Sequence, residues 1–465
     1  MLYGWLAGVG YFAIGTYWIS EPFTVDPGQT WMAPFAVLAM AGGLALFWGL
    51  AAGLYRLCRP RGLLRGIVFA GTLTLAEWLR GHVLTGFPWN LPGETWLAGS
   101  APSQAAAFIG AYGLTWVTVA LAASTGLLLD PVDRRRKAVL AGVLVLVLVG
   151  LYGLGTLRLA RAQPVSANAP LVRLVQADID QKEKWKPENL DQVLGTYLRL
   201  SRQTGARRPD VVIWPEGALP AVIDDLMAPG SPYAPQVASA IGRGQTLMMG
   251  ANRIGLGRLG EPVYFNTLVV FRKAGQDLTV TGLYDKYRLV PFGEFMPLGK
   301  LAGQVGLRSF VHMPEDFTPG GYPAPLASPG LPIFQPMICY EALFPGLVDR
   351  LHGPVRPDWI VNVSNDAWFG SASGPWQHFN ITGYRAIEQG LPIARSTPTG
   401  VTAMIDAFGR TPPNQRLGLG AEGVLDARLP PALAPTLYAR FGDLGLLVLL
   451  IISGVLGIWM RGKSG

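Results

Sequence analysis

Cys339 lies in the string Pro336-Met-Ile-Cys339-Tyr-Glu341, where a short apolar run ends in a thiol. The sequence contains one other cysteine, Cys58. The charge pattern described below predicts that the two cysteines lie on opposite sides of a membrane, so no disulfide should join them. An unpaired thiol in an oxidising compartment needs another reason to be present. Nucleophilic chemistry is one such reason.

Two further strings carry side chains that could activate this thiol. Val211-Val-Ile-Trp-Pro-Glu216 is a strand-like run that ends in a proline and a carboxylate, and Tyr284-Asp-Lys286-Tyr places a lysine just before another apolar run. A carboxylate can take a thiol proton as a general base, and a lysine can stabilise a thiolate and then an oxyanion. Each residue alone is more often structural, but together they predict an acyl-transfer site.

The composition excludes an ordinary soluble protein. Half of the 465 residues are hydrophobic, 15% are charged, and the mean hydropathy is +0.30. These values indicate several membrane spans. Six apolar stretches could span a bilayer, at 2–20, 32–55, 64–80, 103–129, 138–160 and 441–460. The first of these candidate spans is short and the third ends in charged residues, so these two are the weakest.

The net charge of +8 is concentrated beside these apolar stretches, in the loop 56–66 and the run Arg134–Lys137. This placement is typical of topology signals and not of a nucleic-acid surface, so we expect no nucleic-acid partner. The positive-inside rule puts both segments in the cytoplasm, and Arg461 and Lys463 close the chain on the same side. The sequence therefore predicts about five spans in 1–160, an extracytoplasmic domain at 161–438, and a last span with a cytoplasmic tail at 439–465.

The segment 161–438 alternates strand-like and helix-like runs, a pattern typical of an α/β sandwich. The helix-like runs lie at 190–204 and 233–242. The strand-like runs lie at 171–176, 210–214, 246–250, 267–271 and 359–363.

Together, the three reactive strings resemble those of the nitrilase, or carbon–nitrogen hydrolase, superfamily. Further strings, such as Glu77–Trp89, Ser364–Gly370 and Gly374–His378, resemble one membrane branch of it, the apolipoprotein N-acyltransferase family. The resemblance implies a polytopic α-helical membrane domain joined to a nitrilase-like α-β-β-α sandwich. It also implies a multi-pass protein of the bacterial inner membrane whose catalytic domain faces the periplasm.

The resemblance also implies roles for particular residues. Glu216 corresponds to the general base, Lys286 to the lysine that stabilises the oxyanion, and Cys339 to the nucleophile that becomes an acyl thioester. Four accessory residues correspond as well: two glutamates near the triad, a tyrosine that shapes the pocket, and a tryptophan on a mobile loop at its mouth. These are Glu294, Glu341, Tyr340 and Trp185.

The activity implied is a ping-pong transfer of a fatty acyl chain from a membrane phospholipid to the diacylglyceryl-cysteine amine of an apolipoprotein. No cofactor is expected, and the resemblance implies a monomer. Two alternatives stay open: a membrane-tethered amidase that uses water as acceptor, and a non-catalytic scaffold that keeps the fold. His378 could pair with the thiol as a base, but a structural role is favoured. The four histidines show no metal-binding spacing, so no metal site is expected.

The membrane part departs from the family in one respect. The family usually has eight spans and this sequence shows six, so the chain is expected to begin at the family's third span, through a late start or natural shortening. Within the membrane part, the string Arg80–Trp89 has two interpretations. Its aromatic residues could form an ordinary interfacial belt, or they could help to seat a phospholipid headgroup.

Overall fold

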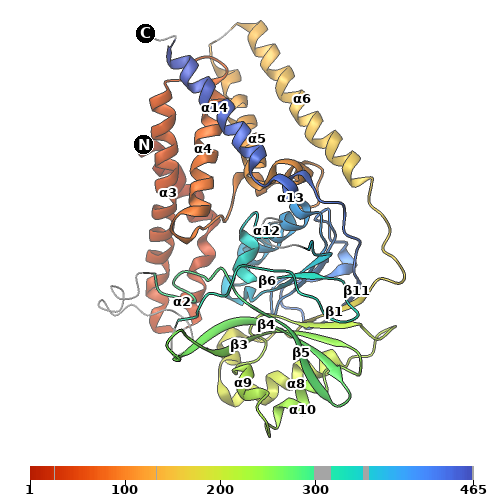
Figure 1. Ribbon diagram of the computed structural model, residues 1–465. Helices are drawn as coiled ribbons and strands as arrows, with labels where there is room; N and C mark the ends of the chain where they lie inside the picture. The colour runs from red at the N-terminus through yellow and green to blue at the C-terminus, as the bar shows by residue number, and fades with distance from the viewer. Residues whose placement is uncertain (26, 132, 298–315, 349–354, 463–465) are drawn as a thin grey trace.

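The computed structural model describes residues 1–25, 27–131, 133–297, 316–348 and 355–462. Long helices from both ends of the chain stand together in one part of the molecule, and the middle of the chain forms a second part built on two sheets (Figure 1). Lys463, which belongs to the predicted cytoplasmic tail, lies outside the residues that the structure describes.

A helix occupies each of the six apolar stretches predicted from the sequence. Within the described residues, three segments are long and apolar enough to cross a membrane: Pro27–Cys58, Pro102–Leu129 and Arg134–Leu159. The first and last helices are apolar but shorter. These helices indicate a membrane protein, with three candidate spans by length and composition. The six helices are α1 (Leu2–Gly15), α3 (Ala33–Cys58), α4 (Arg65–His82), α5 (Ala106–Gly126), α6 (Arg134–Leu159) and α14 (Leu444–Gly462).

Helix α4 carries two charged side chains that are fully buried. Arg80 Nε donates a hydrogen bond to Glu77 Oε2 over 3.2 Å, and the side chains of this ion pair have no exposed surface. Trp48 Nε1 on α3 donates to the other carboxylate oxygen at 2.5 Å. Buried charges are tolerated where they pair with one another, so α4 can pack among apolar helices in spite of its charge.

The middle of the chain forms a six-stranded sheet in the order β11-β1-β2-β3-β4-β5 and a five-stranded sheet in the order β10-β9-β8-β7-β6. Parallel pairing joins β1 to β2, β2 to β3, β6 to β7 and β7 to β8. Every strand predicted from the sequence is present, and β1 and β7 have the predicted bounds. The strands are β1 (Leu171–Gln176), β2 (Val211–Trp214), β3 (Thr246–Leu256), β4 (Pro262–Ala274), β5 (Asp277–Asp285), β6 (Phe334–Ile338), β7 (Trp359–Val363), β8 (Ile393–Ser396), β9 (Thr402–Ile405), β10 (Arg416–Leu417) and β11 (Gly423–Arg428).

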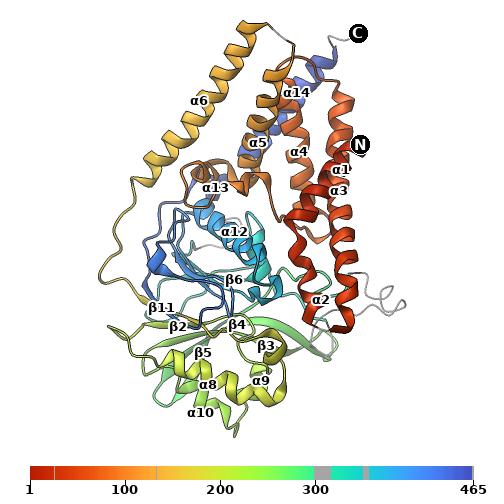
Figure 2. The same cartoon turned by 180° about the vertical axis from the view of Figure 1, so that it is seen from behind.

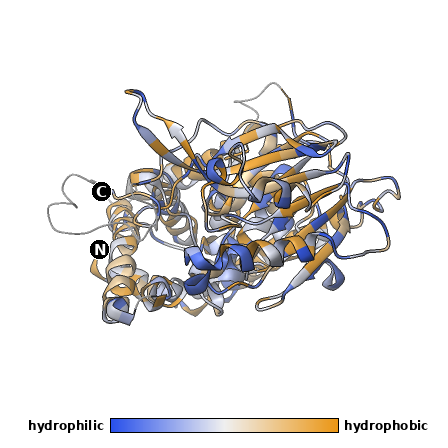
Figure 3. Cartoon of the chain, turned by 90° about the horizontal axis from the view of Figure 1, so that it is seen from below, coloured by the Kyte–Doolittle hydropathy of each residue, from blue (hydrophilic) through white to orange (hydrophobic). Residues whose placement is uncertain are grey.

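Three apolar layers hold the sheets and helices together. Side chains such as Ile213, Met248 and Val361 fill the space between the sheets. Helices α8 (Leu190–Ser201) and α10 (Tyr233–Ala238) cover the outer face of the six-stranded sheet, and α12 (Ser373–Gln389) covers the five-stranded sheet (Figure 2). Viewed from below, several strands of the sandwich carry runs of hydrophobic colour (Figure 3). This order of layers confirms the α-β-β-α sandwich.

Helix α12 also joins the sandwich to the membrane helices. Its Glu388 accepts a hydrogen bond from the backbone N–H of Ala111 at 2.8 Å, where α5 has a non-helical glycine. Its Arg385 forms buried ion pairs with Glu388 and with Glu94, which precedes α5. Burial raises the pKa of Glu94 to about 8, and the guanidinium of Arg385 opposes that rise. The junction is therefore polar and paired, so α12 is held at a fixed position on α5.

Candidate active site

The thiol of Cys339 lies at a strained turn. Strand β6 ends at Ile338, and a short 3-10 helix runs over Cys339–Leu343. Cys339 has φ +46°, a left-handed conformation that costs a non-glycine residue about 1–3 kcal/mol and tends to occur at functional sites. The side chain is 5% exposed. The turn therefore directs a nearly buried thiol out of the end of a strand.

Glu216 lies two residues beyond the end of β2, after Pro215. Its side chain is buried, and the neighbouring strand β3 approaches its backbone closely at Gly250. A Cβ atom on Gly250 would come within 2.5 Å of Glu216 Cα, closer than atoms can pack. The backbone oxygen of Gly250 also accepts a hydrogen bond from Ala218 at 2.9 Å. A glycine is therefore needed at this position for the carboxylate to take its place.

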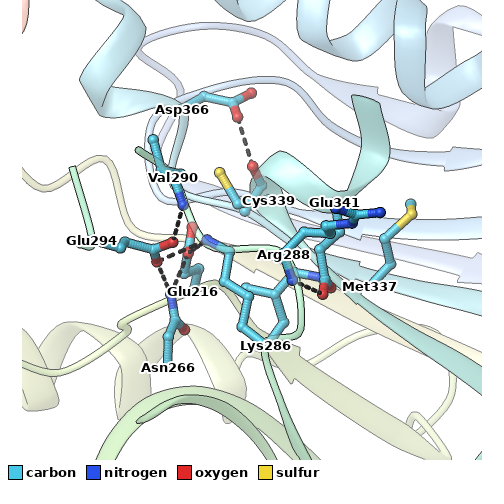
Figure 4. A network of polar contacts seen from close by, with 12 residues as sticks. Glu216, Asn266, Lys286, Arg288, Val290, Glu294, Met337, Cys339, Glu341 and Asp366 are labelled. Atoms are coloured by element: carbon cyan, nitrogen blue, oxygen red, sulfur yellow. Dashed lines mark hydrogen bonds and ion pairs between the residues drawn. The ribbon is translucent and has the colours of Figure 1, made fainter. Parts of the chain in front are cut away.

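Lys286 follows the last residue of β5 and joins two carboxylates (Figure 4). Its Nζ lies 3.0 Å from Glu216 Oε1 and 2.8 Å from Glu294 Oε1. Asn266, on β4, donates from Nδ2 to the same two oxygen atoms, at 2.7 Å each. The ammonium group is 1% exposed, so these interactions take place largely out of water. The structure thus brings together Glu216, Lys286, Cys339 and Glu294, all of them predicted from the sequence.

The charges of these groups follow from burial and from one another. Burial and then the charge of Glu216 raise the pKa of the Cys339 thiol well above its usual range, and Lys286 only partly opposes them. Burial would raise the pKa of Glu216, but the Lys286 ammonium and hydrogen bonds from Asn266, Lys286 and Cys339 bring it below its usual value. Burial would lower the pKa of Lys286, but Glu216 and Glu294 hold it well above the usual range. The resting site therefore contains a neutral thiol, a carboxylate and an ammonium.

This charge state determines how the thiol can react. A carboxylate with a lowered pKa cannot hold the proton of a thiol whose pKa is raised, so a stable thiolate does not form at rest. Glu216 can still accept the proton while a bond forms from Sγ to an electrophile, as general base catalysis requires. Lys286 is then placed to stabilise negative charge that develops on an oxygen atom.

Glu341 connects the nucleophile turn to the lysine strand. Its Oε2 accepts a hydrogen bond from Ile338 N at 2.7 Å. Its Oε1 accepts three more, from the Tyr284 hydroxyl at 2.6 Å, Tyr287 N at 2.8 Å and Arg288 N at 3.2 Å. The side chain is fully buried. Its position predicts a supporting role, because it fixes the segments on either side of the reactive groups.

Removing the Glu341 side chain should therefore destabilise the protein. Glu341→Ala removes the acceptor of one buried backbone N–H, two partly buried backbone N–H groups and one buried hydroxyl, at a cost of roughly 3 kcal/mol or more. We expect the thermal unfolding midpoint in detergent to fall by roughly 5–10 °C. Glu422→Ala is the control, because that carboxylate is half exposed and pairs with Arg199 at the surface. Equal midpoints for the two variants would contradict the supporting role.

His378 lies behind the nucleophile. Its Nε2 is 3.2 Å from the backbone oxygen of Cys339, and its Nδ1 is 2.9 Å from Asp366 Oδ1. Arg395 donates to Asp366 Oδ2 at 2.6 Å, and Ser364 donates to Oδ1 at 2.7 Å. The imidazole thus forms a hydrogen bond with the backbone carbonyl of Cys339 and not with its thiol. This contact fits the structural role that the sequence favoured for His378.

The two remaining predicted residues flank the site. Tyr340 donates its hydroxyl to the backbone oxygen of Gly86 at 2.7 Å, so the residue after the nucleophile is bound to the loop that follows α4. The ring of Trp185 lies beside Gly217, the residue that follows Glu216. A Cβ atom placed on Gly217 would be 3.7 Å from this ring. The preceding residue, Lys184, is fully buried with its Nζ 5.3 Å from that ring. Burial lowers the pKa of Lys184 to about 8, and the charge of Glu216 opposes the shift.

Sequence reasoning missed Asn266, Asp366 and Arg395 as parts of the site. A signal existed for Asn266, because asparagine is uncommon in the middle of an apolar strand. Asp366 lies in the string Ser364–Gly370, which was singled out without a role for this side chain. Arg395 lies in the string Arg395-Ser396, which also resembles the family, but no role was predicted for its side chain. No cluster of three or more potential metal ligands occurs among the residues that the structure describes.

The sandwich and its cysteine site define the class of this domain. A family model described as carbon–nitrogen hydrolase matches residues 171–437, and one described as the apolipoprotein N-acyltransferase N-terminal domain matches residues 1–124. The apolipoprotein N-acyltransferase of Caulobacter vibrioides is 50% identical over 98% of this chain and 85% of its own length. That of Bradyrhizobium diazoefficiens is 38% identical over 99% of this chain and 86% of its own length.

The comparisons therefore agree with the fold on the class, the carbon–nitrogen hydrolases. Within that class, the chain belongs to the apolipoprotein N-acyltransferase family.

Proposed function

We propose that this protein moves a fatty acyl chain from a membrane phospholipid to the N-terminal diacylglyceryl-cysteine amine of an apolipoprotein, through a thioester on Cys339. The observation that carries the proposal is the position of this thiol. It shares a nearly buried site with Glu216 and Lys286. The next residue in the chain, Tyr340, is hydrogen-bonded to Gly86 in the membrane part. The relatives, which are apolipoprotein N-acyltransferases, supply the acceptor.

In the first half-reaction, Sγ of Cys339 attacks the ester carbonyl of the phospholipid while Glu216 takes the thiol proton. Lys286 stabilises the oxyanion of the tetrahedral intermediate. The intermediate collapses with cleavage of the ester C–O bond, and the leaving alkoxide takes the proton back from Glu216. A lysophospholipid departs, and an acyl thioester stays on Cys339.

In the second half-reaction, the α-amine of the acceptor attacks the thioester carbonyl. Glu216 takes a proton from the attacking nitrogen, and Lys286 again stabilises the oxyanion. Cleavage of the C–S bond releases the amide product, and the thiol regains its proton from Glu216. The scheme needs no cofactor, and Glu294 keeps Lys286 charged in both halves through its 2.8 Å contact.

The proposal includes an orientation in the bacterial inner membrane. Arg65, in the first basic segment, pairs with Asp130 at 2.6 Å, close to the second basic run, so both lie at the same end of the helices. The sandwich lies at the opposite end (Figure 1). The positive-inside rule then places the sandwich, within 161–438, in the periplasm, between spans in 1–160 and 439–465. We propose that a single copy acts, because all the reactive groups come from one chain.

The proposal is tested by trapping the intermediate. Protein incubated with phospholipid labelled in its acyl chains, without acceptor, should carry label on Cys339 as a thioester that hydroxylamine cleaves. A synthetic diacylglyceryl lipopeptide added afterwards should receive this label on its amine. Release of the label only as free fatty acid would indicate a hydrolase with water as acceptor. Absence of label at Cys339 would contradict a thioester mechanism.

A further inference from the structure

A cavity lies between the membrane helices and the sandwich, next to the reactive groups. It has a volume of about 160 Å³. One wall comes from the end of α4 and from α5, with Gly81, His82 and Tyr112, and the other wall includes Arg288 and Phe344 from the segments that follow Lys286 and Cys339. A single water needs only about 10–15 Å³ of such space, so the cavity can hold a group the size of a phosphodiester.

Arg288 supplies a positive charge to this cavity. Its guanidinium lies over the rings of Tyr287 and Phe344, at 5.3 and 5.0 Å from their centroids. Its Nε is buried without a hydrogen-bond partner, and within the described ranges no carboxylate lies within 4.0 Å of the group. Arg80 and Arg385, which also lie near this boundary, both have carboxylate partners. A planar cation held on aromatic rings with free donors is suited to an anionic oxygen ligand.

A second free group comes from the membrane side. Tyr112 is 1% exposed, and its hydroxyl has no hydrogen-bond partner among the described residues. A Cβ atom at Gly81 would overlap this hydroxyl, so the glycine leaves the space that the hydroxyl occupies at the cavity wall. A buried hydroxyl without a partner is costly, and a ligand oxygen in the cavity would remove that cost.

The cavity is connected to the reaction centre through a short chain of contacts. The backbone N–H of Arg288 donates to Glu341, which also holds the nucleophile turn through Ile338. The ring of Phe344 lies 5.2 Å from that of Tyr340, the residue after Cys339. In a phospholipid the ester carbonyl and the phosphorus are separated by only a few bonds. A phospholipid whose ester carbonyl lies next to the Cys339 thiol would therefore have its phosphodiester near this cavity.

We propose that the cavity binds the phosphodiester of the acyl-donor lipid, with Arg288 as its charged ligand and the hydroxyl of Tyr112 as a second donor. The inference rests on the proposed acyl transfer and adds the group by which the donor is held. The proposal also gives the beginning of the string Arg80–Trp89 a part in binding the headgroup, because Gly81 and His82 line the cavity.

The test compares two acyl donors in the loading of Cys339: a labelled phospholipid and a fatty p-nitrophenyl ester, which has no phosphate. Arg288→Ala should raise the KM for the phospholipid by about tenfold or more, because it removes a charge-assisted hydrogen bond. Its effect on loading from the ester should be several-fold smaller, and Arg288→Lys should restore part of the loss. Arg416→Ala is the matched control, since its guanidinium lies 5.9 Å from the Trp376 ring, away from the cavity; it should change neither donor.

Three outcomes would count against the cavity. Equal losses with both donors in Arg288→Ala would show a general structural effect, and no loss with either donor would show that the arginine binds nothing in this reaction. Binding of millimolar inorganic phosphate at Arg288 that leaves loading from the phospholipid unchanged would assign the cavity to a free anion. If the wild type were labelled by neither donor, the proposed function itself would be at fault.

Discussion

Replacing Cys339 by serine is expected to lower acyl transfer by at least about 1,000-fold while the protein still folds. Serine has nearly the size of cysteine, so it fits the 5% exposed position and can take the same strained turn. Its hydroxyl, however, is a far weaker acid than a thiol. The pKa of Glu216 is already lowered by Lys286 and Asn266, so this carboxylate is a poor base for such a group.

The measurement follows the label from phospholipid to a synthetic lipopeptide, with thioester formation as the intermediate readout. Cys58→Ser is the matched control, because it removes the chain's other thiol at the end of α3, far along the chain from the site. That variant should keep full activity. Normal transfer by Cys339→Ser, or label found on Cys58, would contradict the assignment of the nucleophile. Melting of both variants near the wild-type temperature would show that folding is not the cause.

The ends of strands carried most of the predictable information about the site. The string Val211–Glu216 combines an apolar run with a proline that stops it, and Pro336–Cys339 likewise combines a short apolar run with the reactive side chain. Both strands formed where these local patterns indicated, because a buried strand needs a continuous apolar run of a few residues. The parallel strands then place their carboxyl ends, and the residues that follow, where α/β folds carry chemistry.

The interactions that hold these residues together could not be predicted in the same way. Cys339 follows a strand of one sheet, and Glu216 and Lys286 follow strands of the other, so the site depends on how two separate sheets stack. Glu341 was identified only through a family resemblance, and the four groups it binds are visible only in the structure. Contacts between residues 50 or more positions apart leave no periodic pattern in the sequence.

The membrane part shows a similar limit. Hydropathy located all six helices, but it could not show why α4 tolerates Glu77 and Arg80. The two side chains pair with each other, and Trp48 completes the hydrogen bonding of the carboxylate. Pairing depends on rotamers and on a neighbouring helix, whereas a hydropathy sum treats each charge as isolated. The structure accordingly explains a charged helix that composition alone leaves doubtful.

Replacing Glu216 by glutamine is expected to change two reactions of the same thiol in opposite directions. Acyl transfer should fall by about 100-fold to 10,000-fold, because the general base is lost. Alkylation of Cys339 by iodoacetamide should become faster at a fixed pH. The charge of Glu216 is one of the causes that raise the thiol pKa, so a neutral amide in its place lowers that pKa and increases the thiolate fraction.

Lys286→Met gives the matched opposite case. The ammonium group lowers the pKa of the Cys339 thiol, so its loss should slow alkylation, and the loss of oxyanion stabilisation should also abolish most transfer. A misfolded site could reduce transfer in both variants, but it would not produce alkylation changes of opposite sign. The pair therefore separates electrostatic roles from structural ones.

The pH dependence of alkylation checks the same charges in the unmodified protein. Because the thiol pKa is raised above the working range, the wild-type rate should climb about tenfold per pH unit from pH 6 to 9 without levelling off. In Glu216→Gln the rate should be higher at each pH, and the curve should start to level at a lower pH than in the wild type. A wild-type curve that levels near pH 7 would mean that a thiolate exists at rest. In that case Glu216 would not be needed to take a proton during attack, and the concerted first step would be wrong.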